Sequence, residues 1–420
     1  MVDDVFKCKH RLSPQSFTRH RTLSFSTLIL YLLNLRKSAA QVELDQFFKA
    51  TEGRRHAVQV VTKFAFFQAR KQLSHTALID VNRIVADGFY AAYEGYRKWN
   101  GFRLCAVDGS MLCLPHEADV VREFGVHTGK VDQRACPMGL VSLYFDVLNH
   151  LVIDARLHPA NASERACAAR HLEHAKPNDL VIYDRGYNAF WLYAAHRAQR
   201  VAFCMRAKVN RGLEFKRFVD SGAQQAVVTL RPNPRSVAQC IERGLSVEPI
   251  RLRLVRVDLP GEVEVLITNL MDDAVYDAAQ FKSLYHQRWG CEENYKRFKH
   301  WVEIENFSGK SALSVKQDFH AKIVTMNLTA LMMLAAQRRV EKKPNRKHVY
   351  RVNFAQALSK MKHTVVILIR GSVTTLRHLI AQTIDYLALT IEPVREARRF
   401  PRRFSNFKKR SYYSCYKRAL

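Results

Sequence analysis

The sequence predicts an α/β protein: a mixed sheet flanked by helices, interrupted by a β-rich insertion, with helical regions at both ends. Short apolar segments with a period of two lie between residues 101 and 206, which is typical of strands. Apolar residues at helical spacing fill both ends of the chain. Glycine and proline concentrate between residues 207 and 273. A chain of 420 residues is too long for one ordinary core, so several regions are expected.

We expect five regions, divided where the periodicity changes. They are a helical N-terminal DNA-binding region (1–98), the first part of the α/β core (99–206), the β-rich insertion (207–275), the last helix of the core (276–310), and a helical C-terminal region with a basic tail (311–420).

The N-terminal region carries aromatic and aliphatic residues at helix-like spacing, with Ser38 and Thr51 as expected helix caps. Arginine and lysine residues punctuate it, as in a small helical DNA-binding domain. Because no helix-turn-helix signature is evident, a helical cap with a soluble basic face explains the pattern equally well.

The core region alternates strands and helices, and two of its strands end on carboxylates. The expected strands are 103–108, 140–147, 151–157, 180–183 and 201–206, and the expected helices run from Ser163 to about 174 and from Asn188 to about 199. Asp108 ends the first strand and Asp184 follows the fourth. If these two strands are parallel neighbours, both carboxylates lie at the sheet edge where ligands of open α/β sheets bind.

The insertion and the C-terminal region complete the pattern. Strands are expected at 227–230, 252–259 and 263–267, the last two forming a hairpin around Pro260 and Gly261. The spacing of apolar residues predicts helices over residues 311–340 and 353–390. From Arg395 the tail mixes cations with aromatic residues, which suits nucleic-acid binding or a disordered basic tail.

The composition limits the class of partner. Lys and Arg number 67 against 38 Asp and Glu, a net charge of +29, which indicates a polyanionic partner such as nucleic acid. A membrane surface or a ribosome would satisfy the charge as well. The nine cysteines include no CxxC pair, which argues against a disulfide framework or a zinc site. The apolar run 23–35 has the length of a buried helix, so we expect a cytoplasmic protein without a membrane span.

The stretch 281–300 carries the most informative pattern. Tyr285, Arg288, Glu292 and Lys299 are separated by steps of three, four and seven residues, which place all four on one stripe of a helix. A carboxylate between long cations suits phosphates and a metal ion, although a solvated face with ion pairs is the common alternative. Glu293 is the rival carboxylate, but it points about 100° off the stripe.

Three carboxylates, Asp108, Asp184 and Glu292, are therefore the candidate catalytic and metal-binding residues. Such a trio can hold two Mg²⁺ ions for phosphodiester chemistry, with Mn²⁺ as a substitute. Each of the three taken alone is also compatible with a structural role, as a turn residue or an ion pair.

Three motifs carry a resemblance to a known family: AVDGS around Asp108, YDRGY around Asp184, and the spacing of Tyr285, Arg288, Glu292 and Lys299. They resemble the DDE transposases of bacterial insertion sequences, specifically the insertion-sequence-four family with its Y-R-E-K signature. The resemblance covers roughly residues 20–310. It implies a ribonuclease-H-like core and cut-and-paste transposition at inverted-repeat ends. It also implies a hairpin intermediate, contacts from Tyr285, Arg288 and Lys299 to the DNA end, a homodimer in the synaptic complex, and a location at the bacterial nucleoid.

One departure concerns tryptophan. Relatives use a Trp in the β insertion to stack a flipped base, whereas the four here are Trp99, Trp191, Trp289 and Trp301. Another side chain then stacks the base or the hairpin step differs, and we interpret Trp289 as core.

The rival functions are a ribonuclease-H-like DNA nuclease without integration and a catalytically inactive DNA-binding protein.

Overall fold

The computed structural model describes residues 3–34, 37–127, 136–209, 212–342, 348–370 and 373–394. The chain divides into two compact units. The first comprises Met1–Ala91, Leu112–Gly139 and Arg297–Leu420, and the second comprises Ala92–Met111 and Leu140–Lys296. The basic tail expected from Arg395 lies outside the described residues.

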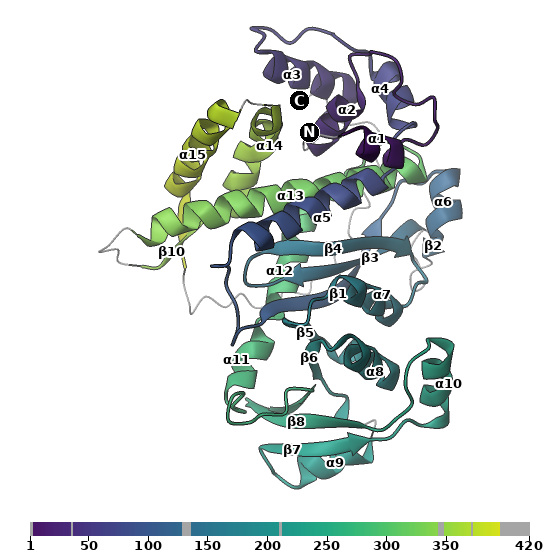
Figure 1. The fold of residues 1–420 in the computed structure, drawn as a ribbon, viewed down its shortest axis with the longest axis vertical. Coiled ribbons are helices and arrows are strands. Elements are labelled where there is room, and N and C mark those ends of the chain that lie inside the picture. Colours follow the sequence, from purple (N-terminus) through teal and green to yellow (C-terminus); the bar gives the residue numbers. More distant parts are fainter. Residues whose placement is uncertain are drawn as a thin grey trace. The chain divides into compact units, whose positions relative to one another are not determined.

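The second unit is built on a mixed sheet flanked by helices, which confirms the predicted fold class (Figure 1). Strand order along the sheet is β3-β1-β5-β6-β9-β8-β7, with β4 paired to β3. The strands are β1 Arg103–Cys113, β3 Cys136–Asp146, β4 Leu151–Pro159, β5 Asp179–Tyr183, β6 Ala202–Arg206, β7 Gln225–Leu230, β8 Ile250–Leu259 and β9 Glu262–Thr268. The helices are α7 Glu164–His171, α8 Phe190–Gln199, α9 Leu213–Asp220, α10 Pro234–Glu242, α11 Gln280–His286 and α12 Trp289–Lys296.

The pairing of the central strands follows the sequence expectation. β1 runs parallel to β5, with Ala106 opposite Ile182, and β5 runs parallel to β6. The two strands that lead to Asp108 and Asp184 are therefore parallel neighbours, which is the condition under which both carboxylates were expected at one edge of the sheet. One difference is that β1 continues past Asp108 to Cys113.

The β-rich insertion extends this same sheet. β9 pairs antiparallel with β6, and the predicted β8–β9 hairpin is confirmed, with Leu259 opposite Glu262 and Gly261 at a φ of 79°. Two helices, α9 and α10, were not predicted within it. Each buries one apolar face: Phe215 and Phe218 are buried on α9, and Cys240 is buried on α10.

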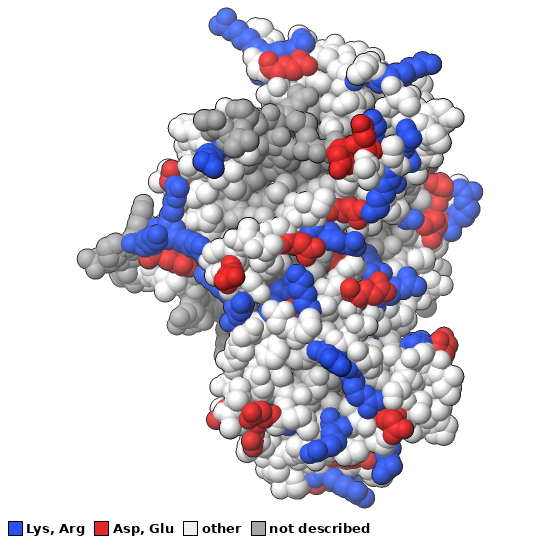
Figure 2. All heavy atoms as spheres, in the orientation of Figure 1, with Lys and Arg blue, Asp and Glu red and all other residues white. Residues whose placement is uncertain are grey.

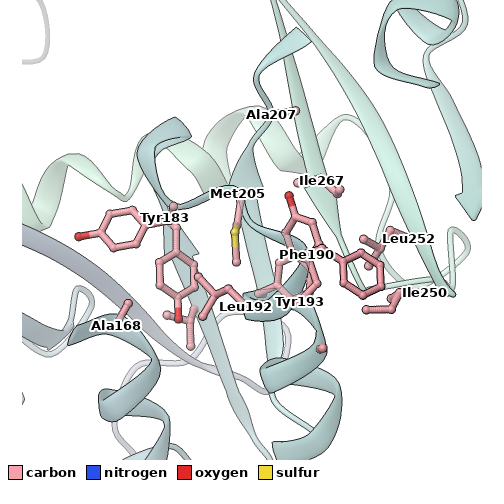
Figure 3. Packing of buried hydrophobic residues seen from close by; sticks show 14 of the residues in the cluster. Ala168, Tyr183, Phe190, Leu192, Tyr193, Met205, Ala207, Ile250, Leu252 and Ile267 are labelled. Atoms are coloured by element: carbon pink, nitrogen blue, oxygen red, sulfur yellow. The ribbon is translucent and has the colours of Figure 1, made fainter. Parts of the chain in front are cut away.

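The core of the second unit lies between its sheet and its helices. Figure 3 shows Tyr183 of β5, Leu192 of α8 and Met205 of β6 together with Ile267 of β9. All four residues are fully buried. Because these apolar side chains come from both halves of the sheet, burial of one continuous core joins the insertion to the central strands.

Helix boundaries near the sheet agree with the sequence at one cap and differ at another. Ser163 caps α7 by accepting from the Ala166 amide. Asn188 does not cap α8, whose N-cap is Ala189. The Asn188 amide instead donates to the carbonyl oxygen of Arg206, a tertiary contact that competes with capping.

A buried ion pair joins the first residues of β1 and β5. Arg103 donates from Nε and Nη2 to the two carboxylate oxygens of Asp179 at 2.7 and 2.6 Å, and both residues are almost completely buried. The Tyr144 hydroxyl also donates to Asp179 Oδ2, at 2.6 Å. The carboxylate is thus fully used, and its loss would leave a buried guanidinium without a counter-charge.

We therefore expect Asp179→Asn to lower the free energy of unfolding by about 3–5 kcal/mol, the usual cost of breaking a buried pair. Glu242→Gln is the control, because Glu242 is 70% exposed and pairs with its neighbour Arg243; its effect should stay within about 0.5 kcal/mol. Urea denaturation followed by tryptophan fluorescence measures both. An Asp179→Asn variant as stable as the control would contradict the interpretation.

The first unit is predominantly helical, as predicted for both ends of the chain. Its helices are α1 Asp4–His10, α2 Phe25–Leu33, α3 Ala40–Glu52, α4 Lys63–Arg70, α5 Thr76–Ala92, α6 Ala118–Phe124, α13 Ala312–Glu341, α14 Phe354–Arg370 and α15 Val373–Leu389. Its short strands are β2 Val126–His127, β10 Tyr350–Val352 and β11 Ile391–Pro393. Figure 1 shows α5 alongside α13, where Asn327 donates to Asn82 at 2.8 Å.

The caps expected in the N-terminal region are wrong. Thr51 lies inside α3, and the N-cap of that helix is Ala39. The buried carboxylate of Glu43 takes over the role of the cap, because it accepts hydrogen bonds from the amides of Lys37 and Ser38 at 2.8 Å. A side chain from inside the helix thus satisfies the donors that precede it.

Helix α13 is the one described helix that is long and apolar enough to cross a membrane by length and composition. About two thirds of its apolar window, 67%, is buried inside the structure. Ser311 caps it with a capping box to Ser314. This burial is the behaviour of a core helix, which passes the same test.

Candidate functional site

Asp108 and Asp184 each accept a hydrogen bond from a nearby glycine amide. Asp108 Oδ1 accepts from the Gly109 amide at 2.9 Å, and Asp184 Oδ1 accepts from the Gly186 amide at 2.6 Å. A Cβ at position 186 would lie 2.8 Å from Asp184 Oδ1, so a larger residue at this position would displace the carboxylate. One oxygen of each carboxylate is thereby fixed beside the parallel strands β1 and β5.

Arg288 connects Glu292 with Asp108. Its Nη2 donates to Glu292 Oε1 at 2.7 Å, and its Nη1 lies 4.0 Å from Asp108 Oδ2. The Arg288 side chain is only 14% exposed, and its Nε has no hydrogen-bond partner within the described part of the chain. A partly unsatisfied cation therefore stands between two of the three predicted carboxylates.

Helix α12 is held against the sheet by the residues around Glu292. The Tyr295 hydroxyl donates to the main-chain oxygens of Asp108 and Val141 at 2.8 and 3.3 Å. A Cβ at Gly290 would lie 3.3 Å from Val147 Cβ, which shows a close approach of helix and strand. Tyr295 was missed in the sequence, although its step of three from Glu292 puts both on one side of the helix.

The pKa of Asp108 shows that the carboxylates act on one another. It is raised to about 6, chiefly by burial and also by the charges of Asp184 and Glu292, while the Gly109 amide and Arg288 oppose the change. Burial and nearby like charges both disfavour the ionised form of this carboxylate. A cation at this place would relieve the repulsion.

The donor chemistry fits a hard divalent ion. Asp108, Asp184 and Glu292 provide oxygen ligands without histidine or cysteine, the set that suits Mg²⁺ or Mn²⁺. Within the described ranges, no three His, Cys, Asp or Glu side chains are close enough together to form a metal-binding group. Arg288 is the positive charge that compensates Asp108 and Glu292 here.

The predicted continuous helix over 281–300 is wrong. Helix α11 ends at His286, the amide of Arg288 bonds the carbonyl oxygen of Tyr285 at 3.1 Å, and α12 begins at Trp289. After Lys296 comes a π-helical turn, Arg297–Trp301, closed by a bond of 3.1 Å from the Val302 amide to the Arg297 oxygen.

These two irregularities change the rotation per residue on either side of α12. The central part of the predicted stripe keeps its contacts, because Arg288 donates to Glu292 and lies beside the Tyr285 ring. Tyr285 lies on α11, half-buried, with its ring centroid 5.9 Å from Arg288 Cζ. Lys299 lies in the π-helical turn and belongs to the first unit.

Of two neighbours of the site, one lies as the sequence predicted and the other does not. Glu293 is exposed and pairs with Lys296, so it points away from the Arg288 cluster, as expected from its angle on the helix. Trp289 is 40% exposed, so its interpretation as a core residue is wrong. It is the first residue of α12, where the helix is not yet covered.

Charge on the surface is dispersed on the face shown in Figure 2. Lys and Arg side chains lie among Asp and Glu side chains there, without gathering into one continuous patch. The excess of +29 thus does not single out a DNA-binding surface on this face.

Comparison with known proteins shows the family to which the chain belongs. A family model described as the transposase DDE domain matches residues 99–328, more than half of the chain. Among solved structures, the chain is similar to the cryo-EM structure of the piggyBac transposase synaptic complex with hairpin DNA. The TM-score is 0.42 at 8% identity, over 86% of this chain and 74% of that one. No curated protein sequence matches the chain.

Proposed function

Because the chain belongs to the family of transposases with a DDE domain, we propose that it carries out cut-and-paste transposition of a bacterial insertion sequence of the insertion-sequence-four family. The reaction is strand cleavage at the inverted-repeat ends followed by strand transfer into target DNA. The observation that supports this most is the position of Arg288, which donates to Glu292 at 2.7 Å and lies 4.0 Å from Asp108 Oδ2.

Asp108, Asp184 and Glu292 would hold the divalent ions, Mg²⁺ or Mn²⁺. When bound, such ions lower the pKa of an attacking water or 3′ hydroxyl and stabilise the leaving oxygen. The Gly109 and Gly186 amides keep one oxygen of each aspartate oriented, so the other oxygen is left to act as a ligand.

Arg288, Tyr285 and Lys299 are the proposed DNA contacts of the Y-R-E-K signature. With a metal ion compensating Glu292 and Asp108, Arg288 is released to bind a phosphate with its guanidinium, a charge-assisted contact. Tyr285 packs beside it and limits its rotation. The protein acts as a homodimer in the synaptic complex, on double-stranded DNA in the bacterial cytoplasm near the nucleoid, and its charge of +29 suits that polyanion.

The test is a strand-transfer assay. The purified protein is incubated with Mg²⁺, a target plasmid and a labelled duplex taken from the DNA that flanks its gene. We expect cleavage at a fixed position and joining of the cut 3′ end to the plasmid. A duplex with the same composition in scrambled order is the control and should stay intact.

The rival functions give different products in the same assay. A nuclease without integration cuts the duplex but joins nothing to the plasmid, and an inactive DNA-binding protein shifts the duplex without cutting it. Either result would overturn the proposed function.

A further inference from the structure

The start of helix α7 lies against both strand ends that carry the aspartates. Oε1 of Glu164 is 3.1 Å from the position that a Cβ on Gly109 would take, and Gly109 directly follows Asp108. The next residue, Arg165, donates from Nε to the carbonyl oxygen of Gly186 at 2.7 Å, two residues after Asp184. The Glu164 carboxylate therefore lies beside the residue that follows Asp108 in β1, and its neighbour Arg165 holds the turn that follows Asp184.

The hydroxyl of Tyr187 supplies an independent observation at the same place. Tyr187 is 1% exposed, and its hydroxyl has no hydrogen-bond partner among the residues that the structure describes. Burial raises the pKa of this hydroxyl well above its usual value, and the charges of Asp108, Glu164 and Asp184 add to the effect. Buried donors without an acceptor normally have a ligand, and the three carboxylates act electrostatically on this one.

Resting on the proposed function, we propose that Glu164 is a fourth carboxylate of the divalent-metal site formed by Asp108, Asp184 and Glu292. The Tyr187 hydroxyl donates to an oxygen ligand in that same site. Four negative charges in one region repel one another, and a divalent cation is the ligand that relieves the repulsion.

A purely structural role for Glu164 makes a different prediction. Glu164 is the first residue of α7, where a carboxylate stabilises the helix through its macrodipole. That effect requires no metal ion. It would appear as a change in the stability of the metal-free protein and leave the affinity for metal unchanged.

The experiment measures Mn²⁺ binding to the full chain without DNA, by electron paramagnetic resonance of the free ion. We expect Glu164→Gln to weaken Mn²⁺ binding by roughly 10–100-fold, the range for residues that support a metal site, and Glu164→Asp to restore part of it. Tyr187→Phe should weaken binding less. The control is Glu214→Gln, because Glu214 is an exposed acid in the first turn of α9, and it should bind Mn²⁺ as wild type does.

The outcomes separate this proposal from the proposed function. If Glu292→Gln loses Mn²⁺ while Glu164→Gln binds it as wild type does, the metal site stands and the role of Glu164 is refuted. If wild type binds no Mn²⁺, both proposals fall. Should Glu164→Gln not fold, the Glu164→Asp variant decides: wild-type affinity in that folded protein, despite the shorter side chain, refutes the proposal.

Discussion

Glu292→Gln should abolish DNA cleavage and leave binding to the element end intact or tighter. The substitution keeps the size of the side chain and removes the charge of a proposed metal ligand. Activity should fall by more than about 100-fold, beyond the usual effect of residues that only support a metal site. Binding survives because Arg288, now without the charged partner at 2.7 Å, is freer to contact a phosphate, and one repulsive charge is gone.

Glu293→Gln is the matched control for this substitution. It is the same change one residue along the same helix, but Glu293 is exposed and paired with Lys296, so cleavage should stay near the wild-type rate. Gel-shift binding and Mg²⁺-dependent cleavage on one labelled end substrate measure both variants. Loss of cleavage in Glu293→Gln with full activity in Glu292→Gln would show that the assignment of the helix is wrong.

The sheet was predictable from the sequence because its strands are short, apolar and bounded by strong turn signals. The parallel pairing of β1 with β5 remained a condition at the level of the sequence, because further strands, including β3 and β4, lie between them along the chain. The β8–β9 hairpin followed from Pro260 and Gly261. By contrast, α9 and α10 were not predicted, because the many glycines and prolines of residues 207–273 favoured strands and turns over two short amphipathic helices.

The geometry around Glu292 was not predictable from spacing alone. Spacing does predict the contact from Arg288 to Glu292, but it does not reveal the turn at Arg288 or the π-helical turn after Lys296, which change the rotation per residue. Nor does it reveal the tertiary bonds from Tyr295 to the main-chain oxygens of Asp108 and Val141. Glu164 appeared in the sequence only as the start of a helix, because no local pattern reveals which strand end a helix start faces.

Cleavage should require a divalent ion and should also fail as pH falls. EDTA should stop the reaction, and added Mg²⁺ or Mn²⁺ should restore it, since the proposed ligands are carboxylates only. With a pKa of about 6, Asp108 becomes protonated below that pH and ceases to act as a ligand. Because protons and metal compete for one carboxylate, the midpoint of the pH profile should move to lower pH as Mg²⁺ is increased. Full cleavage in EDTA would refute the metal assignment.

Protonation of Asp108 links metal binding and pH to the stability of the folded protein. The pKa of Asp108 is higher in the folded protein than its ordinary value of 3.8, so its contribution to stability is fully present below about pH 4 and is lost as pH rises through about 6. The loss amounts to roughly 3 kcal/mol, because one pKa unit corresponds to about 1.4 kcal/mol. Mg²⁺ should offset this cost, so it should raise the unfolding temperature more at pH 7.5 than at pH 5. Asp108→Asn should remove most of that difference; an undiminished difference in this variant would mean that another group couples metal to pH.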